Sequence, residues 1–569
     1  MKSFLLTLIL WFSIVANAQN KVIGIVTDSQ NKPISGVNIS IPEIHKETIS
    51  DADGKYQLIN LPNGNFKIIF SHIGFATQSK DFSSKEKTNT INVTLAETAH
   101  QMDEVIISTV FNKLQSQNVM KVEHESVKSM QQKGATTLIE GLATIPGVSQ
   151  VSTGVSIGKP VIRGLSGNRV LVYSQGVRLE NQAFGDEHGL GLNDSGVDGV
   201  EVIKGPASLL YGSDALGGVL YFIPEKFAKA DTFGVDFGQK YFSNTLGSST
   251  NIGAKGSTDQ FKFLTRVNYT RHSDYKIASP VQSSTSSPDG NRVTNTRYNE
   301  LDFKTGIGYS DSNFSSEFRY NYNRILLGIP EEGIAEQTNE KTPAYPRQAV
   351  YNQLLSLNNT VFLGKTKLDL NLGYIYNDRA EFPVSAIPGS NWHLKTLNYD
   401  TKFHLPKTTK LETIIGVQGM HQINLNVGNE YLIPDATTKD IGAFGTTRYE
   451  FGTNVLQAGI RYDVRKIIGV EHLNFGDVGY LAPIDRKFNS FNASLGYKTS
   501  ITEATILRLN VASGFRAPNI FELSSNGVHD GTIRFEIGNP NLKSEQNFQT
   551  DLNLEYKNSH FEVFVNGFY

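Results

Sequence analysis

Residues 226–569 are dominated by short runs in which apolar and polar side chains strictly alternate. Apolar side chains take every second position in 368–374, 507–511 and 552–556. This period of two predicts β-strands with one apolar and one polar face, and no convincing helical pattern accompanies it. A transmembrane barrel around a wet lumen and a soluble sandwich both use such strands, so alternation alone does not choose between them.

The connections between these strands are more informative, because short and long ones take turns along the chain. Short turns are predicted at 256–260, 310–313, 364–367, 406–410, 452–454 and 557–559, and long stretches near 272–297, 327–348, 379–390, 424–438, 468–486 and 515–545. A barrel with tight turns at one rim and long loops at the other produces this alternation of short and long connections, whereas a sandwich does not require it. We therefore expect a mainly β chain with an antiparallel transmembrane β-barrel over 226–569.

The number of strands is small for such a barrel. About fifteen are expected, whereas a barrel wide enough to enclose a folded domain has about twenty-two. The last run, 561–569, would have no following partner, and each unpaired backbone group in hydrocarbon costs several kcal/mol. The pattern therefore predicts an incomplete barrel, with C-terminal strands missing, in a fragment of a longer protein.

The chain begins with a segment of a different kind. Lys2 precedes an apolar run over 4–15, and the small residues Ala16 and Ala18 flank Asn17 before Gln19. A basic start, a short apolar region and a small-x-small site in this order predict a cleavable signal peptide over 1–18. The mature protein is expected to leave the cytoplasm.

Residues 19–97 predict a small β-sandwich of about eighty residues. Short β-prone runs are expected at 21–27, 37–41, 55–59, 66–71 and 90–95. The stretch GIVTDSQNKPISGVNISI with SDADGKYQLINLPNGNFKIIFSHIGF resembles the carboxypeptidase-regulatory-like domain, a transthyretin-like module. Asp51, Asp53 and Gly54 could open a calcium loop, but the closing glutamate is missing, so we interpret them as a hairpin turn.

The pattern predicts a polar linker over 98–112 and a compact mixed α/β region over 113–225, with a helix at 136–145 that ends before Pro146 and Gly147. This region contains LIEGLATIPGVSQV, IRGLSGNRVLVYSQGVRLENQ and VEVIKGPASLLYGSDALGGVLYF in that order. These three blocks resemble the plug domain of TonB-dependent outer-membrane receptors. SGFRAPNIFEL and GNPNLKSEQ, at 513–523 and 538–546, resemble motifs of the same family's later barrel.

This resemblance implies an outer-membrane receptor of a Gram-negative bacterium, with the N-terminal domain in the periplasm and TonB as the energising partner. It places a TonB box in the linker, although the letters match loosely; the segment consists of Asp103, Glu104, Val105, Ile106, Ile107 and Ser108. A short β-prone run of this kind can add as a strand to the open edge of another protein's sheet. An ordinary linker strand is the alternative.

The ligand is less well defined than the class of protein. The family implies import of a metal chelate, either an iron siderophore or haem, and no built-in cofactor. A metal ion, a glycan and a peptide are further candidates. A surface protein that binds or signals without transport is an alternative of another class.

Composition and short motifs exclude several kinds of binding and catalysis. A formal net charge of −2 removes the electrostatic case for nucleic-acid binding, and the absence of Cys excludes disulfides and thiol chemistry. The string from Gly154 to Gly158 matches G-x-S-x-G, but Pro160 opposes the helix that a nucleophile elbow requires. The Gly-rich stretch 205–218 lacks the GK[ST] of a phosphate loop. We therefore expect no enzymatic activity.

A possible metal site lies between two of the plug blocks. Asp186, Glu187 and His188 follow Gly185, and in an extended loop Asp186 and His188 would point to one side. Carboxylate and imidazole suit zinc, copper or iron, and the resemblance places outward plug loops at the ligand. His529 and Asp530 could complete the site from the barrel, while a solvated loop tip is the alternative.

Four charged plug residues are interpreted as structural or gating groups. They are Arg163 and Arg169 in the second block and Glu201 and Lys204 in the third. Charges on a plug inside a polar lumen usually pair with the barrel wall, and such pairs hold the register and can be released as a switch.

Overall fold

A computed structural model describes most of the chain after the leader. The described residues are 20–44, 46–84, 86–98, 104–152, 155–180, 189–205, 207–278, 292–330, 339–477, 479–502, 504–529, 534–558 and 560–569. Ala16 and Ala18 of the predicted leader lie outside these ranges. No helix in the described ranges combines the length and the hydropathy needed to cross a membrane.

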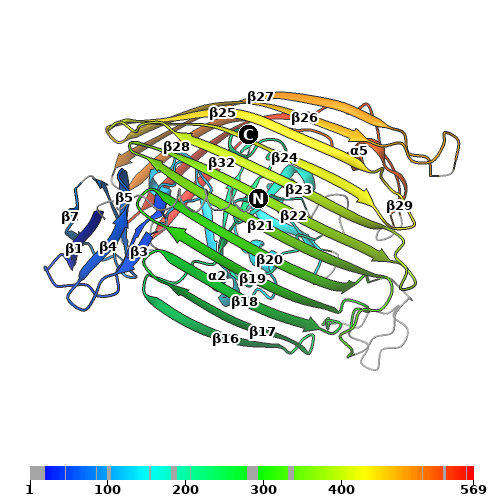
Figure 1. Ribbon diagram of the computed structural model, residues 1–569, viewed down its shortest axis with the longest axis horizontal. Helices are drawn as coiled ribbons and strands as arrows, with labels where there is room; N and C mark the ends of the chain where they lie inside the picture. The colour runs from blue at the N-terminus through cyan, green and yellow to red at the C-terminus, as the bar shows by residue number, and fades with distance from the viewer. Residues whose placement is uncertain are drawn as a thin grey trace, which may run out of the picture.

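The N-terminal domain is a β-sandwich of two small sheets (Figure 1). One sheet has the order β4-β1-β7 with β8 beside β1, and the other has the order β3-β2-β5-β6. The strands are β1 (Asn20–Asp28), β2 (Asn38–Ile41), β3 (Lys46–Ile49), β4 (Lys55–Leu61), β5 (Asn65–Ser71), β6 (Gln78–Ser83), β7 (Thr88–Thr90) and β8 (Val93–Leu95), with a 3-10 turn η1 (Pro42–Ile44) after β2. Apolar side chains of both sheets, including Val26, Ile39 and Phe70, form the shared core.

The turn at Asp51 to Gly54 corrects one expectation. The strands on either side, β3 and β4, belong to different sheets, so the turn passes between sheets and is not a hairpin. The Asp51 carboxylate accepts hydrogen bonds from the backbone N–H groups of Asp53 and Lys55, and Gly54 takes a positive φ of 72°. An Asx-type turn with glycine explains the sequence without a calcium ion.

The plug is a five-stranded mixed sheet, ordered β13-β12-β15-β14-β9, with a separate β10-β11 hairpin. Its elements are η2 (Gln115–Gln117), β9 (Val122–Ser126), α2 (Val127–Gln132), α3 (Leu138–Leu142), β10 (Val148–Ser152), β11 (Gly158–Ile162), η3 (Gly167–Arg169), β12 (Val170–Ser174), β13 (Val177–Leu179), β14 (Val197–Lys204), α4 (Ser208–Tyr211) and β15 (Gly218–Pro224). The predicted helix is present but shorter, because Thr137 caps its start by accepting a hydrogen bond from the Glu140 N–H. Apolar side chains from α2, α3 and one face of β14 and β15 form its main core, and Ile203 and Val219 on the other face belong to a second apolar cluster with α4.

Fifteen antiparallel strands surround the plug in chain order from β16 to β28, followed by β31 and β32. They are β16 (Thr232–Phe242), β17 (Gly247–Ser257), β18 (Phe261–His272), β19 (Tyr298–Ser310), β20 (Phe314–Gly328), β21 (Arg347–Leu363), β22 (Thr366–Phe382), β23 (Asn391–His404), β24 (Leu411–Asn426), β25 (Ala436–Phe451), β26 (Asn454–Gly469), β27 (Ile484–Thr502), β28 (Thr505–Arg516), β31 (Glu545–Lys557) and β32 (Glu562–Phe568). β16 and β32 are the two ends of this sheet, so the barrel is not closed.

Side-chain orientation in these strands distinguishes a barrel from a sandwich. Along β19 the charged side chains of Glu300, Asp302 and Lys304 are buried against the plug side, whereas Phe303 and Ile307 are exposed on the outer face. A soluble sandwich would bury the apolar set. Apolar residues outward and polar residues inward are the arrangement of a membrane barrel with a polar interior.

Short and long connections alternate as predicted, and the short ones gather at the rim beside the sandwich (Figure 1). Phe66 of β5 packs edge-on against Phe362 at the end of β21, with ring centroids 6.0 Å apart. The Lys46 ammonium donates to the carbonyl oxygen of Asp259 in the turn after β17, at 2.9 Å. The sandwich is therefore docked on the rim that carries the short turns.

The long connection after β28 is more structured than expected. It contains a short helix, α5 (Ile520–Ser524), and a hairpin of β29 (Asn526–His529) and β30 (Arg534–Ile537). Asn519 and Glu522 form a capping box at the start of α5, each side chain accepting from the other residue's backbone N–H. We had expected no helix in 226–569; the N-x-x-E spacing of this box was the signal for one.

Candidate functional site at the docked linker and the plug–barrel seam

The linker segment 104–108 is docked against the plug. Glu201 of β14, whose side chain is fully buried, accepts hydrogen bonds from the backbone N–H groups of Ile107 and Ser108 at 3.0 and 2.6 Å. The Tyr211 hydroxyl donates to the Ser108 carbonyl oxygen at 2.6 Å. Ile106 has no exposed surface and packs among apolar plug side chains. The segment also pairs with the chain that follows, because the Ile106 N–H donates to the Lys113 carbonyl oxygen at 2.9 Å and the Gln115 N–H donates to the Glu104 carbonyl oxygen at 2.8 Å.

His124 of β9 lies beside this docking point, between two carboxylates. Its Nε2 is 3.3 Å from Glu104 of the linker and its Nδ1 is 3.9 Å from Glu201. Burial acts to lower the pKa of His124, but Glu201 and Glu104 outweigh burial and raise the pKa above its ordinary value. A protonated His124 therefore stabilises the docked linker.

The chain after the docked segment is fastened to the barrel wall. The Lys113 ammonium pairs with Glu412 of β24 at 2.9 Å. Arg448 of β25 and Arg508 of β28 donate to the carbonyl oxygens of Gln117 and Asn118 at 2.9 and 3.1 Å. The chain over 113–118 is therefore held by the wall, whereas 104–108 is held by the plug.

A second feature is the seam where plug strand β13 and the turn after α4 meet the wall. Asp214 of this turn binds Arg178 of β13 and Arg465 of β26, the latter at 2.9 Å. Burial acts to raise the pKa of Asp214, but the guanidinium groups of Arg465 and Arg178 outweigh it and hold the pKa below its usual range. Asp214 therefore stays ionised as a bridge between the plug and the wall.

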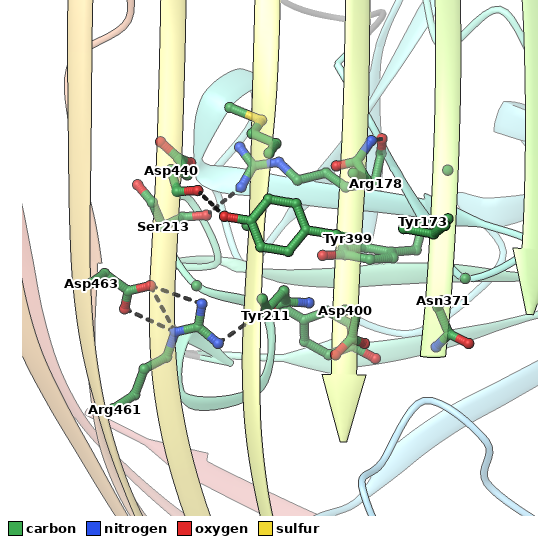
Figure 2. A pocket seen from close by; sticks show the side chains of 18 residues that line it. Tyr173, Arg178, Tyr211, Ser213, Asn371, Tyr399, Asp400, Asp440, Arg461 and Asp463 are labelled. Atoms are coloured by element: carbon green, nitrogen blue, oxygen red, sulfur yellow. Dashed lines mark hydrogen bonds and ion pairs between the residues drawn. The ribbon is translucent and has the colours of Figure 1, made fainter. Parts of the chain in front are cut away.

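The wall continues this charge network along β25 and β26. Arg465 also binds Asp440 through two hydrogen bonds of 2.7 and 2.6 Å, and Arg461 binds Asp463 with its Nε 2.8 Å from both carboxylate oxygens. Figure 2 shows Arg461 and Asp463 on the wall, with Arg178 and Tyr211 of the plug across a cavity from them. The Tyr399 hydroxyl donates to the Asp440 carbonyl oxygen across the same wall, at 3.0 Å.

Two polar cavities lie along this seam and share Arg178. The first is lined by Tyr173, Tyr211 and Asp400 among others. The second is lined by Glu180, Asp214 and residues at the start of α5. The Arg178–Asp214–Arg465 bridge, which we call the seam bridge, stands where they meet. Ion pairs of this kind can exchange partners with water or a ligand, unlike a packed apolar contact.

The four charged plug residues from the sequence have two kinds of partner. Arg163 pairs with Asp551 of β31 at 2.7 Å, and Arg169 donates to Glu545 of β31 at 2.9 and 2.6 Å. Lys204 instead pairs with Glu123 of the plug at 3.3 Å, and Glu201 holds the linker. The expected wall contacts are therefore present for the two arginines, whereas the partners described for Lys204 and Glu201 belong to the plug and the linker.

The metal candidates are only partly described. Asp186, Glu187, His188, Asp530 and Asp103 of the linker lie outside the described residues. His529 ends β29 and pairs in register with Arg534 of β30. Within the described ranges, no cluster of three or more His, Cys, Asp or Glu side chains is arranged to hold a metal ion. The metal site stays a prediction.

Sequence reasoning missed the seam bridge. Arg461, Asp463 and Arg465 occupy alternate positions of one strand, so all three face the lumen. Three charges on one face of a barrel strand are a usable sign of a plug contact. Arg178 and Asp214 carry no comparable local sign.

A plug held inside an antiparallel barrel by ion pairs, with a linker docked beneath it, defines a plugged outer-membrane receptor. Family profiles agree: the CarboxypepD_reg-like domain matches residues 22–107, the TonB-dependent Receptor Plug Domain residues 115–219, and the TonB dependent receptor-like, beta-barrel residues 207–569. The last covers more than half of the chain. The chain belongs to the TonB-dependent receptor family, whose members are receptors and transporters of the Gram-negative outer membrane and not enzymes.

Individual relatives handle different ligands. Heme/hemopexin utilization protein C of Haemophilus influenzae is 25% identical over 500 residues, covering 76% of this chain and 67% of that protein. The FrpB iron transporter from Neisseria meningitidis superposes with a TM-score of 0.63 at 16% identity, covering 79% and 71%. A variant of the ferric enterobactin receptor from Pseudomonas aeruginosa, in complex with enterobactin, gives 0.61 at 16% identity, covering 79% and 71%. The two structural likenesses establish the fold alone.

Proposed function

We propose that this protein imports a scarce ligand across the outer membrane when TonB pulls on the linker segment 103–108. The observation that carries the proposal is the docking of this segment on the plug: two N–H bonds to Glu201, one carbonyl bond to Tyr211, the Glu104–His124 pair and the buried Ile106. Backbone bonds from Ile106 to Lys113 and from Gln115 to Glu104 pair it with the chain that follows. A β-prone segment held by contacts of this kind can be taken over by the sheet edge of a partner. Its place at the rim that carries the sandwich and the short turns fits a periplasmic location.

Deletion of residues 103–108 tests the handle. We expect uptake to be lost while ligand binding at the cell surface is kept, because the deleted residues are remote from the long loops. A matched control deletes residues 127–132, which form α2; this should impair the plug itself and not separate binding from uptake. Unimpaired uptake after deletion of 103–108 would refute the handle.

The ligand that we propose is a metal chelate, either haem or an iron siderophore, with a metal ion as the second candidate. The names of the relatives support the chelate. The Asp186, Glu187 and His188 cluster, with His529 and Asp530 as further ligands, supports a metal ion, since carboxylate and imidazole suit zinc, copper or iron.

A double substitution, Asp186→Ala with His188→Ala, separates the two candidates. A metal-ion receptor should lose metal binding and growth under metal limitation. A chelate receptor should keep uptake of haemin or ferric enterobactin. Unchanged metal binding and metal-limited growth in the double variant would rule out the metal site.

A further inference from the structure

The short plug segment from Ser208 to Asp214, which comprises α4 and the following turn, touches both the docked linker and the barrel wall. At one end the Tyr211 hydroxyl donates to the Ser108 carbonyl oxygen at 2.6 Å. At the other end the Asp214 carboxylate forms the seam bridge with Arg178 and Arg465. Only Gly212 and Ser213 lie between Tyr211 and Asp214 in the sequence.

The same segment is fastened to the barrel at the end of β28. The Asp214 N–H donates to the Phe515 carbonyl oxygen at 2.9 Å, and the Ala517 N–H donates to the Ser213 hydroxyl at 3.2 Å. The Phe515 N–H donates to the Ser208 hydroxyl at 3.3 Å. Residues 515–517 lead directly into the long connection that carries α5, at the rim opposite the short turns.

The conformation of the turn depends on these contacts. Asp214 has a φ of 81° and Gly212 a φ of 79°, so both lie in the left-handed region, which an aspartate occupies at an energetic cost. A Cβ on Gly212 would lie 2.8 Å from the Arg461 guanidinium, which shows how closely the turn approaches the wall. A strained turn of this kind keeps its shape only while the surrounding contacts hold it.

We infer that segment 208–214 couples the docked linker to the seam bridge, so that release of Ser108 weakens the bridge and opening of the bridge weakens linker docking. This inference rests on the proposed function. Its physical basis is that Tyr211 is buried and its ring packs edge-on against Tyr173, with centroids 4.7 Å apart. When Ser108 leaves, the Tyr211 hydroxyl loses its acceptor in a buried site, which favours movement of the ring.

Movement of Tyr211 would directly change the contacts at the seam between the plug and the wall. Tyr211, Gly212 and Ser213 line the first cavity, beside Arg178 (Figure 2). Asp214 lines the second cavity together with Asn519 and Ile520 at the start of α5. The coupling is reciprocal by thermodynamic necessity: a change at the α5 end that loosens Asp214 must also favour release of the linker.

The natural absence of Cys allows a direct test. Ser108→Cys introduces a nearly isosteric thiol at a position that is 4% exposed, so maleimide labelling of the purified full-length receptor reports linker release. Tyr211→Phe in this background removes one hydrogen bond and keeps the ring, and we expect labelling to rise about fivefold. Asp214→Asn should also raise labelling, although it leaves the linker contacts intact.

Tyr221→Phe is the matched control, because Tyr221 stacks on Tyr173 in the same aromatic cluster without the bond to Ser108. Its labelling rate should equal that of the parent. A parental rate in Asp214→Asn, or an equal rise in Tyr221→Phe, would overturn the coupling. Loss of uptake on deletion of 103–108 with no effect of Asp214→Asn would leave the proposed function standing and reject the coupling alone.

Discussion

The interior of the plug and its seam with the barrel are built from opposite kinds of contact. Inside the plug, Leu142, Val202 and Phe222 are each at most 1% exposed and belong to an apolar cluster that reaches Leu354 and Ile375 of the wall. At the seam, Arg178, Asp214 and Arg465 meet through charged hydrogen bonds beside polar cavities. When water enters, apolar side chains lose the favourable free energy of burial, whereas the charges of a separated ion pair can be hydrated. The comparison indicates a plug that can shift against the wall and keep its own core.

The largest expected effect comes from breaking the apolar side of this comparison. Phe222→Ala removes a nearly fully buried ring from the plug core and should destabilise the plug by about 3–5 kcal/mol. Protease resistance of the plug during a urea titration measures the change. Lys128→Ala on the exposed face of α2 is the control. Equal resistance of the Phe222 variant and the parent would contradict the assignment of this core.

A smaller loss of stability is expected when the seam between the plug and the barrel wall is disrupted. Arg465→Met leaves the buried Asp214 and the partly buried Asp440 carboxylates with less compensation, and we expect the plug to be held about 2 kcal/mol less tightly. Hydrogen exchange should rise at 212–214, while exchange in the plug core stays unchanged. Adding Asp214→Asn to Arg465→Met should recover part of the loss, because the uncompensated charge is removed. If hydrogen exchange rose in the plug core as well as at 212–214, the difference between core and seam would be contradicted.

The contact between the sandwich and the rim extends the comparison to a third region. Phe362 is 8% exposed and packs into the sandwich cluster, so Phe362→Ala should weaken docking of the sandwich by about 1.5–3 kcal/mol. Hydrogen exchange of β5 at the contact should increase. Leu363→Ala, at an exposed neighbouring position, should have no effect. Unchanged exchange in the Phe362 variant would show that the rim contact is held by other groups.

The smallest effect concerns pH. Glu201 of the plug and Glu104 of the docked linker both raise the pKa of His124, and only the contribution of Glu104 depends on docking. Protonation of His124 therefore stabilises docking at low pH, and this contribution is lost as pH rises through the raised pKa. Labelling of the Ser108→Cys receptor should therefore increase with pH beyond the intrinsic increase of the thiol. His124→Gln in the same background supplies that intrinsic curve. Parallel curves for the two receptors would show that His124 does not act on docking.

The sequence allowed the barrel to be predicted because its signal is local. Alternation and the exchange of short and long connections can be read within each strand pair, and the fifteen-stranded sheet confirms them. Docking of the linker could not be predicted in this way, since Ser108 and Glu201 lie 93 positions apart. The seam bridge joins Asp214 to Arg465 over 251 positions. Such pairs depend on the position of the plug inside the barrel, and the local alternation of apolar and polar residues carries no information about that position.

The central claim is that this receptor imports its ligand by mechanical coupling to TonB. The most direct measurement compares surface binding and uptake of radioiron-labelled haemin and ferric enterobactin in matched cells with and without TonB. We predict that binding of the accepted chelate is equal in both cells and that its uptake occurs only where TonB is present. Equal uptake in both cells would contradict the claim.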